Sequence, residues 1–120
     1  MIRWKKMRRE PLPNETILSF LNGEEFVLQD LLAENKNALF YAVRSQTTGQ
    51  AVVLKEFFNS HWVRLRGAPA LKGWEQEPPD SRKLSRTYLW LRRQAEQEQR
   101  MNQELCGSVR CVIPEKPVLP

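Results

Sequence analysis

The sequence predicts a small α+β domain, in which a twisted antiparallel sheet of three to four strands packs against one long helix. Two neighbouring segments, 39–44 and 51–57, show the two-residue periodicity of strands and are joined by a polar turn that contains a glycine. Further along the chain, apolar residues at positions 84, 88, 91 and 95 recur at helical spacing. The strand periodicity and the glycine-containing turn predict the sheet, and the helical spacing predicts the helix that covers it.

Three strands joined by two tight turns are expected, at about residues 25–32, 39–44 and 51–57. The first turn is the polar stretch 33–38. The second turn, 46–50, is a hairpin loop in which Gly49 supplies a positive φ. The third strand divides its side chains between two faces, with Val52 and Leu54 on one face and Val53, Lys55 and Phe57 on the other.

Lys55 interrupts an apolar run, and two interpretations of it are open. A lysine that points at solvent from an edge strand is a common protection against aggregation between strands. Alternatively, Lys55 lies on a buried face, where an unpaired ammonium group would cost several kcal/mol. The second interpretation requires a phosphate or a carboxylate partner elsewhere in the chain.

The long helix is expected to begin at Asp80 or Ser81 and to run to about Leu105. At 100° per residue, Glu98 lies about 40° from the centre of the apolar stripe, so the helix brings this carboxylate near the sheet. A boundary residue hydrogen-bonded to solvent is the alternative interpretation of Glu98. The arginines expected on the opposite face, toward water, are Arg82, Arg86, Arg93 and Arg100.

The remaining segments complete the expected organisation. Residues 1–12 are interpreted as a basic flexible tail, 13–113 as the folded domain and 114–120 as a proline-rich tail. Residues 14–23 are expected to form one or two helical turns. The apolar side chains that these turns would pack on the sheet are Ile17, Phe20 and Leu21. A long connection with a short extended piece at 62–65, anchored by Trp74, is expected before the helix, and a short strand is expected at 109–113.

Composition places limits on location and chemistry. The chain of 120 residues has a net charge of +5 and a pI near 9.6. It contains no apolar run that approaches the ~20 residues of a membrane helix, and its first ten residues lack the apolar region of a secretory signal. A cytoplasmic protein is therefore expected, with Cys106 and Cys111 as free thiols. A single histidine, His61, and the absence of a C-x-x-C motif argue against a metal site.

The order of several motifs resembles the start of a bacterial eukaryotic-type Ser/Thr protein kinase domain. The segments that carry the resemblance are residues 12–18, 26–32, 39–43, 48–50 and 52–60. In that family the corresponding run reads L-P-x-G-T-x-L, a strand, a glycine-rich loop, V-Y-x-A, a T-G turn and V-A-I-K-E-F-F-P-S. The resemblance covers about residues 12–60, extends loosely to about 113, and implies the fold of a kinase N-lobe.

The resemblance implies a degenerate nucleotide site. Lys55 corresponds to the strand lysine that contacts nucleotide phosphates and pairs with a helix glutamate, for which either Glu98 or Gln94 is the match. The three glycines of the phosphate loop correspond to Ala33, Asn35 and Ala38. Two positions beside the adenine carry larger residues than the family's, namely Phe40 and Val53. Weak ATP binding, or none, is expected.

The motifs H-R-D and D-F-G, which supply the catalytic base and the magnesium ligands in kinases, do not occur in the chain. The sequence therefore predicts a non-catalytic, kinase-N-lobe-like fragment that acts as a binding or regulatory module, with no catalytic residue and no resident cofactor. A protein partner, or a second copy of the chain, is expected on the uncovered lobe surface. Two alternatives are a basic nucleic-acid-binding module and the first lobe of a kinase whose catalytic lobe is missing from this chain.

Overall fold

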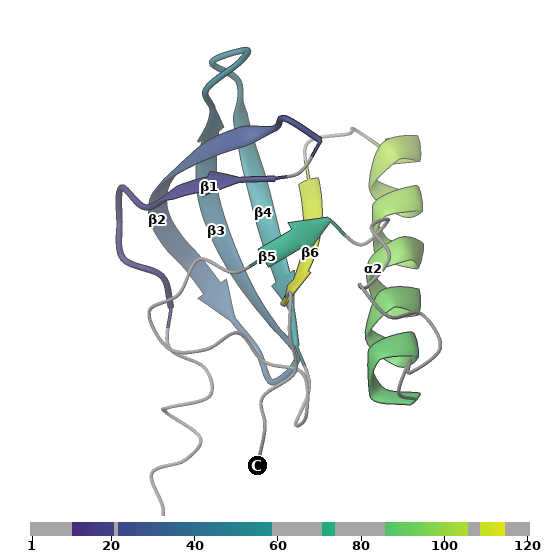
Figure 1. Ribbon diagram of the computed structural model, residues 1–120. Coiled ribbons are helices and arrows are strands. Elements are labelled where there is room, and N and C mark those ends of the chain that lie inside the picture. Colours follow the sequence, from purple (N-terminus) through teal and green to yellow (C-terminus); the bar gives the residue numbers. More distant parts are fainter. Residues whose placement is uncertain (1–10, 21, 59–70, 74–85, 106–108, 115–120) are drawn as a thin grey trace, which may run out of the picture.

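The computed structural model of the chain describes residues 11–20, 22–58, 71–73, 86–105 and 109–114 (Figure 1). These residues form, in order, β1 (Ile17–Ser19), β2 (Glu25–Glu34), β3 (Ala38–Ser45), β4 (Ala51–Phe57), β5 (Leu71–Gly73), α2 (Arg86–Leu105) and β6 (Val109–Pro114). The six strands belong to one sheet with the order β1-β2-β3-β4-β6-β5. Figure 1 shows that this sheet curls into a nearly closed barrel, with α2 lying along its outside.

The fold class predicted from the sequence, an antiparallel sheet of three to four strands packed against one long helix like a kinase N-lobe, is wrong. The sheet has six strands, and β4 pairs with β6 in parallel. The sheet also curls into a nearly closed barrel, and β2 carries two register shifts against β3, between Leu28 and Asp30 and between Leu31 and Ala33. Such bulges bend and twist a strand, which favours closure over a flat sheet. Alternation along a strand shows which residues share a face, but it is the same in an open sheet and in a barrel.

Two hydrophobic clusters result from this closure. The larger cluster fills the barrel, and its buried members are Leu12, Leu18, Phe20, Phe26, Leu28, Leu39, Tyr41, Val43, Leu54, Phe58, Leu71 and Val112. The smaller cluster lies between the outside of the barrel and α2, and its buried members are Phe57, Tyr88, Leu91, Ala95, Cys111 and Ile113. The helix therefore covers one outer part of the barrel and does not cover the main core.

The central hairpin agrees with its prediction. Strand β4 begins and ends where the periodicity placed it, and Gly49 in the β3–β4 turn has a φ of 75°. Val52 and Leu54 face the barrel interior, where they join the larger cluster, whereas Phe57 joins the helix-side cluster. Because β4 pairs with β3 on one side and β6 on the other, Lys55 does not lie on an edge strand.

The segment before the hairpin differs from its prediction. Residues 17–19 form strand β1 in place of a helical turn, because they pair with β2 in the register Ile17↔Val27. Phe20 is buried, as expected, but Ile17 is 54% exposed, and Leu21 lies outside the described residues. Leu12, which the sequence assigned to the flexible tail, is buried in the barrel.

The helix confirms its predicted stripe. Tyr88, Leu91 and Ala95 are fully buried, and the arginines at 86, 93 and 100 are exposed. The expected long connection contains strand β5, and β6 runs one residue further than predicted, through Pro114. The predictions for 62–65, Trp74, the helix start at Asp80 or Ser81 and the thiol of Cys106 lie outside the described residues.

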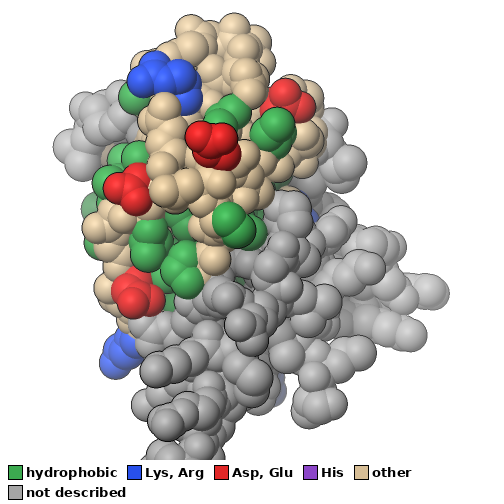
Figure 2. All heavy atoms as spheres, turned by 90° about the vertical axis from the view of Figure 1, so that its left-hand side faces the viewer, with side chains coloured by type: hydrophobic (Ala, Val, Ile, Leu, Met, Phe, Trp, Pro, Cys, Tyr) green, Lys and Arg blue, Asp and Glu red, His purple; other side chains and the backbone are tan. Residues whose placement is uncertain are grey.

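Hydrophobic side chains also reach the surface on the side of the barrel away from α2. Figure 2 shows them there, interspersed with acidic side chains. On β1 and β2, Ile17 and Leu32 are each 54% exposed. In the part of the chain that the structure describes, no helix combines the length and apolar character needed to cross a membrane.

Candidate functional site

Lys55 and Glu98 meet on the outside of the barrel. The lysine projects from the face of β4 that α2 covers, and its Nζ donates a hydrogen bond to Glu98 Oε1 in an ion pair. The side chains are 15% and 30% exposed, respectively. Each charge offsets part of the desolvation cost of the other. The contact predicted between strand lysine and helix carboxylate is therefore present.

Two aromatic rings flank the same ammonium group. The Nζ atom of Lys55 lies 5.0 Å from the ring centroid of Phe40 and 4.7 Å from that of Phe57. The sheet register explains both contacts, because Phe40 is the cross-strand partner of Lys55 on β3 and Phe57 lies two residues along β4. A cation at this distance from a ring centroid is attracted by the ring's quadrupole. Lys55 is therefore fixed by three groups.

Glu98, rather than Gln94, is the helix residue that pairs with Lys55. The two residues are four apart and so lie on the same face of α2, one turn from each other. Gln94 lies close to Glu98 on the protein surface, but its neutral carboxamide lacks the charge needed to form an ion pair with an ammonium group. The alternative in which Glu98 bonds only to solvent is excluded by its ion pair.

The β2–β3 turn next to this pair satisfies its own backbone. Asn35 Oδ1 accepts hydrogen bonds of 2.8 Å from the N–H groups of both Asn37 and Ala38. The N–H of Asn35 donates to the carbonyl oxygen of Ala38 at 3.0 Å. Asparagine is common in turns because its short side chain can bond to nearby backbone groups in this way. The N–H groups of Asn35, Asn37 and Ala38 are thus already occupied and are not free to bind a phosphate.

A groove of about 310 Å³ joins the turn, β4 and the helix. We name it the lysine groove. The residues that line it are Asn35, Asn37, Ala38, Lys55, Phe57, Trp90, Gln94, Gln97, Glu98 and Met101. Four of the seven residues predicted for a cofactor site therefore come together here, namely Lys55, Glu98, Asn35 and Ala38. Phe40 joins them through its contact with Lys55.

The other two predicted residues do not line this groove. Ala33 is exposed on β2, opposite Phe40 in the sheet. Val53 is half-buried on β4, between its cross-strand partners Ala42 and Val109. Neither residue is part of the lining of the lysine groove.

Sequence reasoning missed two prominent residues of the lysine groove. Trp90 and Met101 are 42% and 56% exposed, although both are large and apolar. They are 11 residues apart, so they fall within about 20° of each other on the helix and about 16 Å apart along it. Their position off the buried stripe at 88, 91 and 95 was the available signal, because an apolar residue off the stripe must face water or a partner.

No family model, curated protein or solved structure matches this chain, and the resemblance to Ser/Thr protein kinases stays a prediction from motifs.

Proposed function

We propose that this protein is a non-catalytic binding module whose lysine groove receives an extended segment of a partner protein. One observation carries the proposal. Trp90 and Met101 stand exposed on the helix wall of the groove, beside the Lys55–Glu98 ion pair. Aromatic residues and methionine are enriched in protein interfaces, where a central apolar contact is surrounded by polar groups.

The rest of the lining suits a polypeptide backbone. Four carboxamide side chains line the groove, those of Asn35, Asn37, Gln94 and Gln97. A carboxamide both donates and accepts hydrogen bonds, which is what successive peptide groups require. The stretch of about 16 Å between Trp90 and Met101 matches about five residues of extended chain. The groove therefore has the chemistry and the length for a short peptide segment.

Nucleotide binding at the same place is expected to be weak and independent of magnesium. A phosphate group would compete with the Glu98 carboxylate for Lys55. Asn37 and Ala38 line the groove, and their backbone N–H groups are bonded to the Asn35 side chain. A phosphate site normally offers several free backbone N–H groups. Here both features must be displaced before a phosphate can bind.

Peptide-library selection on the folded protein tests the proposal. Selected peptides should lose at least about tenfold in affinity for Trp90→Ala, the size of effect expected at an interface hot spot. Leu89→Ala is the matched control, because Leu89 is 44% exposed on the neighbouring helix position but does not line the groove. Equal losses for the two variants, or no selectable peptide, would contradict the proposal. ATP binding in the micromolar range that requires magnesium would contradict the expected weak nucleotide affinity.

A second candidate function, nucleic-acid binding, is favoured by the outer face of α2. Arg86, Arg93 and Arg100 are exposed there at seven-residue spacing, about 10 Å apart along the helix. The chain as a whole carries a net charge of +5. Arg100 is already paired with Glu96 at 2.7 Å, which reduces the free charge of this face. Filter binding across a salt series tests this function, because phosphate contacts make the binding constant depend steeply on salt concentration. The double variant Arg86→Gln/Arg93→Gln should reduce that slope.

A further inference from the structure

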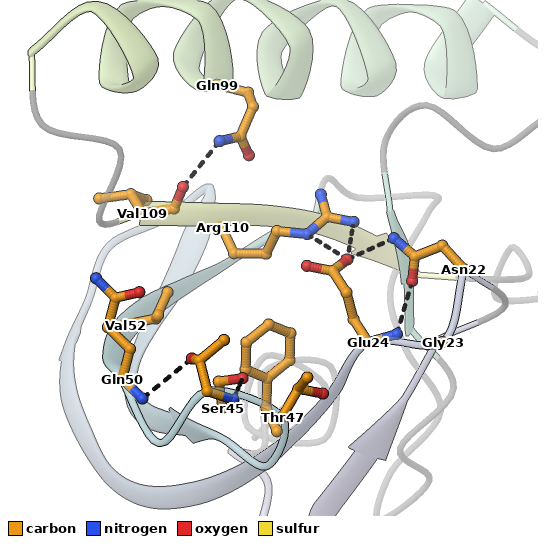
Figure 3. A pocket seen from close by; sticks show the side chains of 12 residues that line it. Asn22, Gly23, Glu24, Ser45, Thr47, Gln50, Val52, Gln99, Val109 and Arg110 are labelled. Carbon is orange, nitrogen blue, oxygen red and sulfur yellow. Dashed lines mark hydrogen bonds and ion pairs between the residues drawn. The ribbon is translucent and has the colours of Figure 1, made fainter.

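A second cavity lies at the far end of the β3–β4 hairpin from the lysine groove. Its volume is about 430 Å³, and Figure 3 shows it in close-up. Three parts of the chain enclose it: the β1–β2 turn, the β3–β4 hairpin and the start of β6 with the adjoining part of α2. We name it the hairpin pocket. Its size falls in the range of pockets that hold small organic ligands.

The Glu24 carboxylate is held in a fixed position at the wall of this pocket. Its Oε1 atom accepts hydrogen bonds from Arg110 Nε at 3.0 Å, from Arg110 Nη2 at 2.8 Å and from Asn22 Nδ2 at 2.6 Å. Arg110 in turn lies over the ring of Phe20, 5.8 Å from its centroid, and its side chain is only 13% exposed. The anchoring is therefore one-sided, because all three donors use the same oxygen.

The second carboxylate oxygen of Glu24 is the feature that points to a ligand. Figure 3 shows it on the side of the carboxylate away from Asn22, directed toward the middle of the pocket. No side chain or backbone group among the described residues bonds to it. Burial raises the pKa of Glu24, but hydrogen bonds from Asn22 and Arg110 and the charge of Arg110 outweigh it and lower the pKa below the ordinary value. At neutral pH the carboxylate is charged, and this oxygen can accept a hydrogen bond from a ligand.

The opposite wall carries neutral groups that form hydrogen bonds. The hydroxyl groups of Ser45, Thr47 and Thr48 and the carboxamide of Gln50 line it. Ser45 Oγ accepts from the Thr48 N–H at 3.1 Å, which leaves its own hydroxyl hydrogen to donate. Apolar area comes from Phe26, Val52 and Val109. The pocket thus combines one fixed anionic acceptor, several neutral polar groups and a small apolar floor.

We propose that the hairpin pocket binds a monosaccharide unit, with Glu24 Oε2 accepting a hydrogen bond from one of its hydroxyl groups. A sugar offers hydroxyl donors to the carboxylate, hydroxyl acceptors and donors to the hairpin, and C–H surface to the apolar floor. A neutral ligand is favoured over an ammonium, because Arg110 already balances the charge of Glu24 and would repel a second cation nearby. An anionic ligand is disfavoured by the exposed carboxylate oxygen.

Titration of the isotopically labelled full chain with D-glucose, D-ribose and D-galactose, followed by amide NMR shifts, tests this assignment. At least one sugar should give saturable shifts confined to the backbone amides of the pocket, including Gly23, Thr48 and Arg110. Glu24→Gln should weaken that sugar about tenfold or more, because a hydrogen bond to a charged group is replaced by a neutral one. Glu15→Gln is the matched control, since Glu15 is exposed, makes the same change of charge and lies outside the pocket.

A second variant keeps the test decisive if Glu24→Gln disturbs the Arg110 anchor. Gln50→Ala removes an exposed side chain of the lining without touching that ion pair, and it should also weaken sugar binding. Shifts spread over the whole surface, or none with any sugar, would overturn the assignment. A preference for n-butylammonium over every sugar, lost in Glu24→Gln, would overturn it in favour of a cation site. Retained sugar affinity in both variants would place the binding elsewhere.

Discussion

Replacement of Lys55 by methionine tests the ion pair that connects the barrel to the helix. Methionine keeps most of the side-chain volume between Phe40 and Phe57 but removes the ammonium group. Glu98, 30% exposed, then loses its partner next to an apolar surface. An unsatisfied buried polar group costs about 1–3 kcal/mol. Since water reaches Glu98 in part, we expect the lower half of this range, a loss of about 1–2 kcal/mol in the free energy of unfolding.

Chemical and thermal denaturation measure this loss. For a domain of this size, 1–2 kcal/mol corresponds to a decrease in melting temperature of roughly 4–8 °C. A double-mutant cycle with Glu98→Leu separates the pair from other effects. Because the double variant leaves no unpaired charge, it should be more stable than Lys55→Met alone. An unchanged melting temperature in Lys55→Met, or losses that simply add in the double variant, would refute the account of the pair as a mutual compensation of charge.

Three further predictions concern other parts of the molecule. Gly49→Ala should lower the free energy of unfolding by about 1 kcal/mol in chemical denaturation, because the φ of 75° is unfavourable for a residue with a Cβ. No atom lies within 4 Å of the added Cβ, so the cost is backbone strain alone, and Gly49→Asn should cost less. The folded-state pKa of Glu24 is lowered, so its contribution to stability is present at neutral pH and is lost as the pH falls through that pKa. The difference in the free energy of unfolding between wild type and Glu24→Gln should therefore disappear in acid. A difference that persists at low pH would contradict the pairing with Arg110. Cys111 should resist thiol reagents at pH 8 in a Cys106→Ser background, because burial and the nearby Glu98 charge raise its pKa to about 12. Rapid labelling of the Cys111 thiol in the folded protein would contradict this prediction.

Part of the candidate site could be predicted because it depends on local geometry. Two-residue periodicity put Lys55 and Phe57 on one face of β4, and the structure has them there. Helical spacing put Glu98 beside the buried stripe, close enough to the sheet to meet Lys55. Both predictions use the angle between neighbouring side chains, which is fixed within one strand or one helix. The lysine groove itself was not predicted, because Trp90 and Met101 acquire their role only from what packs beside them.

By itself, the sequence determined the hairpin from Leu39 to Phe57, the faces of its strands and the buried stripe of α2. Only the tertiary structure decided that the sheet curls into a nearly closed barrel, because this curvature depends on bulges in β2 and on β6 pairing in parallel with a strand more than 50 residues earlier. The hairpin pocket shows the same division, since Glu24 and Arg110 meet across 86 residues of chain. Local patterns fix the directions of side chains within an element. The partners of each element are fixed by contacts between distant segments, whose pairing the pattern within one segment does not encode.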